Sequence, residues 1–163
     1  MIEAVRVPDD RKAAVIGRGG RTREMIEKAT RTQITVSDDV EIDGEDVLMV
    51  LMAKEMVTAI GRGFSAKDAM KLRQEGCELR TISLEGENER KRKRLFGRVI
   101  GREGRSRELI EKETGASLCV RGKTLCMIGT PEELDPAQEA VEKLLQGKTH
   151  AYAYKRMKIR KAG

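Results

Sequence analysis

The sequence predicts an α+β protein built from two tandem modules, each with the order strand, helix, helix, strand, strand, helix. The main observation is a repeat: residues 15–36 recur as residues 99–120, with 13 of 22 positions identical and no gap. The copies lie 84 residues apart, which suits a small domain better than a solenoid repeat. The length of 163 residues therefore fits a first module with a connecting helix (1–76) and a second with a basic tail (77–163).

The first module shows strand signals at its start and centre, with helical spacing between and after them. Pro8 and the two aspartates after it are expected to end the first strand, and Gly17 to end the first helix. The second helix is expected to place Met25, Ile26 and Ala29 on one buried face. The predicted elements are strand 2–7, helix 11–16, a helix after Gly20, strands 33–36 and 40–42 around a turn at 37–39, and helix 46–60.

A connector follows the long helix. Residues 61–65 interrupt the helical pattern, and Ser65 with Asp68 forms a capping box that opens a helix over 66–75. Gly76 is expected to end this helix. Because no Gly/Ser-rich or Pro-rich tract follows, we expect an ordered extra helix between the modules and not a flexible linker.

The second module repeats the order of the first, with a strand over 78–84, a basic helix over 90–100 and a hairpin turn at Gly122-Lys123. Its last helix is expected to start at Asp135, since Asp can cap, Pro136 suits the first helical position and Gln138 completes a capping box. The buried stripe of this helix is predicted to be Val141, Leu144 and Leu145.

The formal charge of +6 and the pI near 9.3 favour a polyanionic partner. The excess lies entirely in the second half: residues 1–76 hold 13 basic and 14 acidic side chains, whereas residues 77–163 hold 20 and 13. The second module, with its basic run at 90–94 and basic residues at 155–161, is therefore expected to be the main site for a polyanion.

Several other classes of protein find little support. No stretch approaches the roughly 18 consecutive apolar residues of a membrane span, so a cytoplasmic protein is expected. The three cysteines lack the spacing of zinc or redox sites, and His150, the one histidine, has no evident catalytic partner. We expect neither enzyme activity nor a cofactor or metal. With 2% aromatic residues, base stacking on aromatic platforms is also unexpected.

The repeat carries one motif twice, V-I-G-x-x-G-R-x-R-x-x-[IL]-x-x-x-T, at Val15 and again at Val99. With the order of elements around it, this motif resembles the type I KH domain, in which a three-stranded antiparallel sheet packs on helices. A single G-x-x-G would be a weak signal, but the motif occurs twice, each time after an apolar pair and before an amphipathic helix. The resemblance implies binding of single-stranded RNA by a groove that grips about four nucleotides.

Glycines suit this task because a phosphodiester backbone must approach the main chain closely, and a helix that starts after the loop directs free N–H groups and a positive dipole toward it. The apolar floor of the groove is expected to use Ile100, Leu118 and Val120, for each of which a purely core role remains open. The candidate RNA-binding residues are Gly17, Arg18, Gly19, Gly20, Arg21 and Arg23 in the first copy, and Arg98, Ile100, Gly101, Arg102, Glu103, Gly104, Arg105, Arg107, Arg121 and Lys123 in the second.

Two features leave an alternative open, in which the glycines only join helices and the arginines form a solvated face. The first hairpin region is acidic, with six carboxylates between residues 38 and 46. In the second loop Glu103 places a carboxylate beside the expected phosphate path, unless its side chain points to solvent.

The whole chain resembles archaeal tandem type I KH proteins, which are related to the eukaryotic small-subunit rRNA-processing factor that partners the Nob endonuclease. The tandem spacing, the stretch AIGRGFS at 59–65 and the tail HAYAYKRMKIRK carry this resemblance. It implies binding to the 3′ end of small-subunit rRNA or its precursor in ribosome maturation. We also expect a monomer. The implied protein partners are the alpha subunit of a translation initiation factor or the endonuclease. The alternatives are a general KH adaptor for mRNA or exosome substrates and a protein-docking scaffold on the pre-ribosome.

Overall fold

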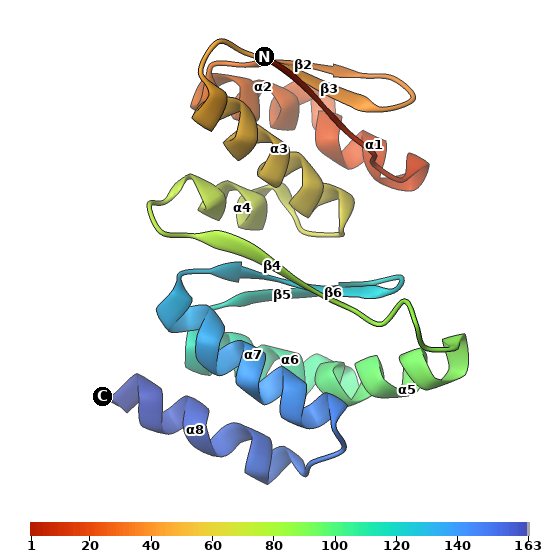
Figure 1. Cartoon of the computed structure of the whole chain (residues 1–163), viewed down its shortest axis with the longest axis vertical. Coiled ribbons are helices and arrows are strands. Elements are labelled where there is room, and N and C mark those ends of the chain that lie inside the picture. The colour runs from red at the N-terminus through yellow and green to blue at the C-terminus, as the bar shows by residue number, and fades with distance from the viewer. Residues whose placement is uncertain (163) are drawn as a thin grey trace. The chain divides into compact units, whose positions relative to one another are not determined.

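The computed structural model describes residues 1–162, and the side chains of residues 1–157. Backbone contacts form two compact units, unit 1 (Met1–Glu75) and unit 2, which begins at Gly76. Each unit contains a three-stranded antiparallel sheet and the order β-α-α-β-β-α (Figure 1). The predicted α+β fold class is therefore confirmed.

The sheet of unit 1 has the strand order β1-β3-β2, so the last strand of the hairpin lies between the other two. Asp9 and Asp10, expected to stand outside the first helix, lie in its first turn, where negative charge favours the positive end of the helix dipole. The elements are β1 (Ile2–Val5), α1 (Asp9–Ile16), the 3₁₀ turn η1 (Arg18–Gly20), α2 (Arg21–Thr30), β2 (Gln33–Val36), β3 (Val40–Asp43), α3 (Val47–Gly61), α4 (Ala66–Ala69) and η2 (Met70–Arg73).

The core of unit 1 lies between the sheet and helices α1 to α3. On α2 the buried positions are Ile26 and Thr30, four residues apart, and the Thr30 hydroxyl donates a hydrogen bond to the Ile26 carbonyl. Met25, expected on the buried face, is 41% exposed, because the helix turns the Ile26 stripe toward the core. The predicted connecting helix also differs: Ser65 caps α4 as expected, but the α-helix lasts four residues and continues as η2.

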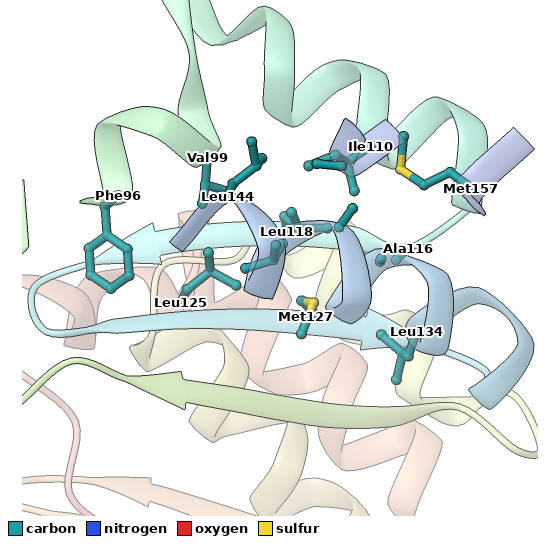
Figure 2. Packing of buried hydrophobic residues seen from close by; sticks show 14 residues of the cluster. Phe96, Val99, Ile110, Ala116, Leu118, Leu125, Met127, Leu134, Leu144 and Met157 are labelled. Atoms are coloured by element: carbon teal, nitrogen blue, oxygen red, sulfur yellow. The ribbon is translucent and has the colours of Figure 1, made fainter. Parts of the chain in front are cut away.

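Unit 2 has the corresponding strand order β4-β6-β5, and all six residues of β6 are buried. Figure 2 shows its core, where Leu125 and Met127 of β6 meet Val99, Ile110 and Leu144 of the helices. The elements are β4 (Glu78–Ser83), α5 (Glu89–Ile100), η3 (Arg102–Gly104), α6 (Arg105–Thr114), β5 (Ser117–Arg121), β6 (Thr124–Gly129), α7 (Pro131–Leu145) and α8 (His150–Ala162).

Helix α7 starts four residues before Asp135, contrary to the sequence prediction. Thr130 is the N-cap, and its backbone N–H donates to Glu133 Oε1 at 2.9 Å. Pro136 therefore lies inside the helix, where its ring is buried. Because proline has no N–H, it cannot bond to the carbonyl of Glu132 four residues earlier, and Glu132 is exposed. The Asp135 carboxylate accepts a hydrogen bond from Arg80 at 2.9 Å instead of capping a helix.

The C-terminal segment, expected to be a basic tail, forms helix α8. Its narrow apolar stripe, Ala153 and Met157, is buried in the core of unit 2. Arg156 forms an ion pair with Glu139 of α7 at 2.9 Å. The predicted basic residues from Lys158 onward have side chains outside the described residues. No helix in the described part of the chain is long and apolar enough to cross a membrane.

Glu139 links α7 to α8 and also pairs with Lys143 at 3.2 Å. Burial raises the pKa of Glu139, but the hydrogen bonds and charges of Lys143 and Arg156 outweigh it and bring the pKa below its ordinary 4.5. A carboxyl whose pKa is depressed by folding contributes stability above its unfolded pKa and loses it as the pH falls.

We therefore expect Glu139→Gln to lower the free energy of unfolding at pH 7 by about 0.5–1 kcal/mol. The deficit should shrink as the pH falls below about 4.5. Urea unfolding between pH 7 and pH 3.5 measures it. Glu142→Gln on the same helix is the control, because the Glu142 carboxylate accepts a hydrogen bond from the neutral amide of Gln138 and is in none of the ion pairs of the described residues. A deficit that stayed constant across this pH range would contradict the ion-pair explanation.

Candidate nucleic-acid interface

The two glycine loops have the same backbone geometry. Gly17 and Gly101 end their helices with φ of 77° and 75°, and Gly20 and Gly104 follow with φ of 79° and 76°. In each loop the N–H of the last glycine donates to the carbonyl of the first, at 3.1 Å and 3.2 Å. Helices α2 and α6 begin with the next residue. The sequence repeat is therefore a structural repeat of helix, tight turn and helix.

The first glycine of each loop is required by packing as well as by backbone angle. A Cβ on Gly101 would lie 2.6 Å from the Cβ and 2.8 Å from the backbone N of Ser106. On Gly17 it would lie 2.3 Å from Oγ1 and 2.7 Å from the backbone N of Thr22. Any side chain here would push the following helix away, so these glycines set the distance between the two helices.

The last glycine of each loop has open space where a side chain would be. A Cβ on Gly104 would meet nothing within 4 Å, and one on Gly20 would meet only the guanidinium of Arg23, at 3.9 Å. The main chain at this point is open on the side where a side chain would be. The N–H groups of Arg21 and Arg105, the first residues of α2 and α6, donate to the carbonyls of Arg18 and Arg102, and the N–H groups that follow them have no intrahelical partner. An anion can therefore approach the backbone closely and meet the positive end of the helix dipole.

The third loop position differs between the copies. Gly19 and Glu103 both have left-handed angles, with φ of 61° and 56°. Glycine adopts this conformation freely, whereas a side chain there costs about 1 kcal/mol or more. The Glu103 side chain is 72% exposed and lies 3.4 Å from Arg105, which is itself exposed, so the carboxylate points to solvent and pairs weakly.

The arginines form two groups. Arg18 and Arg21, with Arg102 and Arg105 at the equivalent positions of the second copy, are exposed on the loops and the first helical turns. Arg23 and Arg107 are half-buried one turn later, and the Nε of each has no hydrogen-bond partner among the described residues. The nearest carboxylate to Arg107 Nε belongs to Glu111, at 3.9 Å. Both Nε atoms are buried, so any phosphate contact would have to use the terminal nitrogens of these guanidinium groups.

The other candidates lie outside the loop itself. Arg98 uses its guanidinium within unit 2, donating to the carbonyls of Leu144 and Lys148. Arg121 ends β5, and Lys123 lies exposed in the turn between β5 and β6. The basic run of α5 is exposed except for Arg92, which is half-buried and donates to the Glu87 carbonyl.

Of the three apolar candidates for the groove floor, Leu118 belongs to the core, while Ile100 and Val120 are half-buried. The matching hairpin of unit 1 is acidic, with Asp38 and Asp39 exposed in its turn. Within residues 1–162 no three His, Cys, Asp or Glu side chains gather as a metal site would require.

Sequence reasoning missed Ser106 and Tyr154. Ser106 packs under the second glycine loop, and its Oγ lies 2.7 Å from the Tyr154 hydroxyl of α8. The repeat has a hydroxyl side chain at this position in both copies, Thr22 in the first and Ser106 in the second, and this could have indicated a role for Ser106. No sequence pattern pointed to Tyr154, because the helix that carries it was not predicted.

Comparison with protein families gives two matches. A model described as eukaryotic type KH-domain (KH-domain type I) matches residues 77–162. A model of the KH domain matches residues 2–59. The KH domains of this family bind RNA and are generally not enzymes.

Several whole proteins are similar to this chain. The KH domain-containing protein MJ0443 of Methanocaldococcus jannaschii is 40% identical, over 99% of this chain and 77% of its own length. The crystal structure of Dim2p from Pyrococcus horikoshii is 41% identical, with a TM-score of 0.88 over 98% of this chain and 99% of that one.

Two further solved structures match. The same organism's a/eIF2alpha-aDim2p-rRNA complex contains a chain that is 41% identical, with a TM-score of 0.90 over 99% of this chain and 94% of that one. A protein of unknown function from Aeropyrum pernix, APE0754, is 30% identical, with a TM-score of 0.92 over 99% and 91% of the two chains.

The loop geometry predicts different costs for three glycine-to-alanine substitutions in unit 2. Gly104→Ala should lower the free energy of unfolding by about 1 kcal/mol, the cost of its left-handed angle alone. Gly101→Ala adds an overlap with the backbone of Ser106 and should cost at least about 2 kcal/mol. Gly97→Ala, in open space within α5, should stabilise by about 0.5–1 kcal/mol and is the control. Chemical denaturation measures all three, and equal costs at Gly101 and Gly104 would contradict the packing argument.

Proposed function

The chain belongs to the archaeal Dim2p family of tandem KH-domain RNA-binding proteins, and from this premise we propose that it binds the 3′ end of small-subunit rRNA or its precursor. Its role would be that of a ribosome maturation or assembly factor. The observation that carries the proposal is the open main chain at Gly104, which lies at the start of α6 and is flanked by exposed arginines. The rRNA present in the solved aDim2p complex supports the choice of RNA.

The proposed contact is between phosphates and the loop backbone. A phosphate at Gly104 would accept hydrogen bonds from the N–H groups at the start of α6, while Arg102 and Arg105 supply charge from either side. Arg107, whose side chain is 41% exposed, would reach the next phosphate through its terminal nitrogens. Phosphate contacts hold the strand in place, and the half-buried apolar side chains Ile100 and Val120 would lie against bases.

The second module is proposed to be the principal RNA reader. Residues 77–163 carry 20 basic and 13 acidic side chains, and Lys123 lies exposed in the hairpin turn where the first module has Asp38 and Asp39. An RNA strand that reached both the glycine loop and the hairpin would meet positive charge in unit 2 and repulsion in unit 1. In the domain assignment proposed here, residues 1–76 form the first KH domain with its connecting helix and residues 77–163 the second.

The first module is proposed to serve a protein partner as well as RNA. Its loop has the same geometry as the second, with Gly17, Arg18, Gly19, Gly20, Arg21 and Arg23 in place. Its acidic hairpin is better suited to a basic protein surface than to phosphates. An initiation factor alpha subunit is the favoured partner, since the solved aDim2p complex contains a/eIF2alpha. The protein is proposed to act in the cytoplasm, as a monomer, without enzymatic activity.

The RNA proposal is tested by changing the exposed middle residues of each loop and leaving its glycines in place. Arg102→Asp/Glu103→Asp and Arg18→Asp/Gly19→Asp give both loops the sequence Gly-Asp-Asp-Gly. All four positions are exposed, and Asp tolerates the left-handed angle better than most residues, so folding should survive. We expect the second-loop variant to bind a single-stranded RNA of the small-subunit 3′ end at least about tenfold more weakly, with a smaller loss for the first-loop variant.

A scrambled RNA of equal length is the control for sequence preference, and circular dichroism checks folding. Selective binding that is lost only in the second-loop variant supports the division of labour between modules. If wild type binds both RNAs equally, the general adaptor is favoured. If neither variant loses affinity, RNA contact is general electrostatics and the glycine-loop mechanism is wrong.

A further inference from the structure

We propose that α8 is a brace that holds the second glycine loop in its RNA-binding shape, with Tyr154 as the main positioning residue. The inference rests on the proposed function, because it concerns the same loop. It goes beyond that function in assigning a role to side chains that would not touch RNA themselves.

The first tie runs from α8 to the helix that follows the loop. Tyr154 OH lies 2.7 Å from Ser106 Oγ, and Ser106 is the second residue of α6, only 5% exposed. Ser106 in turn lies so close to Gly101 that a Cβ there would overlap it, at 2.6 Å. Tyr154 is therefore separated from the first glycine of the loop by one side chain, and it fixes the side chain that fills the space beneath the loop.

The second tie runs to the helix that precedes the loop. His150 Nε2 lies 2.9 Å from the carbonyl oxygen of Arg98, which can only accept, so Nε2 donates the hydrogen bond. Arg98 lies in the last turn of α5, three residues before Gly101, and its guanidinium donates to the carbonyls of Leu144 and Lys148. One helix thus holds both sides of the loop, the end of α5 through His150 and the start of α6 through Tyr154.

The brace is itself fixed to unit 2. Ala153 and Met157 of α8 are buried in the core, and Arg156 pairs with Glu139 of α7. His150 and Tyr154 lie one helical turn apart, with their rings in an edge contact at 5.8 Å. The two contacts to the loop therefore come from a rigid element, and a loop fixed before binding loses less freedom when RNA binds.

The need for a brace is greater in the second loop than in the first. Glu103 holds a left-handed angle that side chains rarely adopt, where the first loop has Gly19. In unit 1 the element after α3 is the four-residue helix α4, and Thr22 takes the position of Ser106. A long helix after the last KH helix is thus seen in unit 2 and not in unit 1 over the described residues, which matches the proposal that unit 2 is the principal RNA reader.

The test compares Tyr154→Phe with Tyr152→Phe, the same chemical change two residues away on the same helix. Tyr152 is exposed, and its ring lies under the ammonium group of Lys143, with Nζ 4.8 Å from the ring centroid. Losing the hydroxyl at Tyr154 leaves buried Ser106 without this partner, so we expect RNA affinity to fall about tenfold and amide exchange at residues 104–107 to accelerate. Tyr152→Phe should bind RNA as wild type does.

Two more variants separate positioning from stability. Ser106→Ala should lose affinity to a similar degree, and the double variant with Tyr154→Phe should lose no more than either single variant, because both remove one interaction. Leu125→Ala, in the core strand β6 and outside α8, should lower the melting temperature, yet bind normally at a temperature where it is fully folded.

Wild-type affinity in Tyr154→Phe, or a loss in Leu125→Ala equal to that in Tyr154→Phe at that temperature, would overturn the brace. Failure of the proposed function is seen elsewhere: in a wild-type protein that does not bind RNA, or in an Arg102→Asp/Glu103→Asp variant that still does.

Discussion

The close packing of a glycine against the helix that follows it is the constraint on which the rest of this structure depends. At Gly101 and Gly17 the main chain comes so near to the residue five positions later that no side chain fits between them. This contact brings the end of one helix against the start of the next and leaves the last glycine of the loop open. The accessible main chain, the helix N-terminus and the flanking arginines all follow from it.

The two units share this constraint but differ in their charge and in their support. Unit 2 has a basic surface and a helix that bonds to both sides of its loop, whereas unit 1 has an acidic hairpin and continues after α3 into a short helix. One duplicated loop geometry is thus placed in two electrostatic settings. The proposed division between RNA binding and protein binding rests on this difference and not on the loops themselves.

Much of the fold was predictable from sequence because the repeat marks the same local signals twice. Gly17 and Gly101 end helices as predicted. The predicted turn at Gly122-Lys123 is also present, and it sets the register of β5 and β6, in which Cys119 lies opposite Cys126. The start of α7 was not predicted, because Asp135 and Pro136 imitate a helix start while Thr130 supplies the real cap. Thr130 and Asp135 are both good N-cap residues, and the sequence alone does not show which of them tertiary packing selects as the start of the helix.

Helix α8, which holds the second glycine loop, was harder to predict from sequence than the loop itself. Among the side chains of α8 that the structure describes, those of Ala153 and Met157 are buried within a basic segment, so the sequence pattern is typical of a charged tail. Its contacts with Ser106 and Arg98 join residues about 50 positions apart, which no local pattern shows.

The most direct test of the account is an NMR titration of the protein with single-stranded RNA of the small-subunit 3′ end, followed at the backbone amides. The central claim is that phosphates bind the main chain at the open end of the second glycine loop. It predicts the largest shifts at residues 102–106, and little change at the exposed basic run of α5. Shifts spread evenly over the basic surface, with the loop amides unmoved, would contradict it.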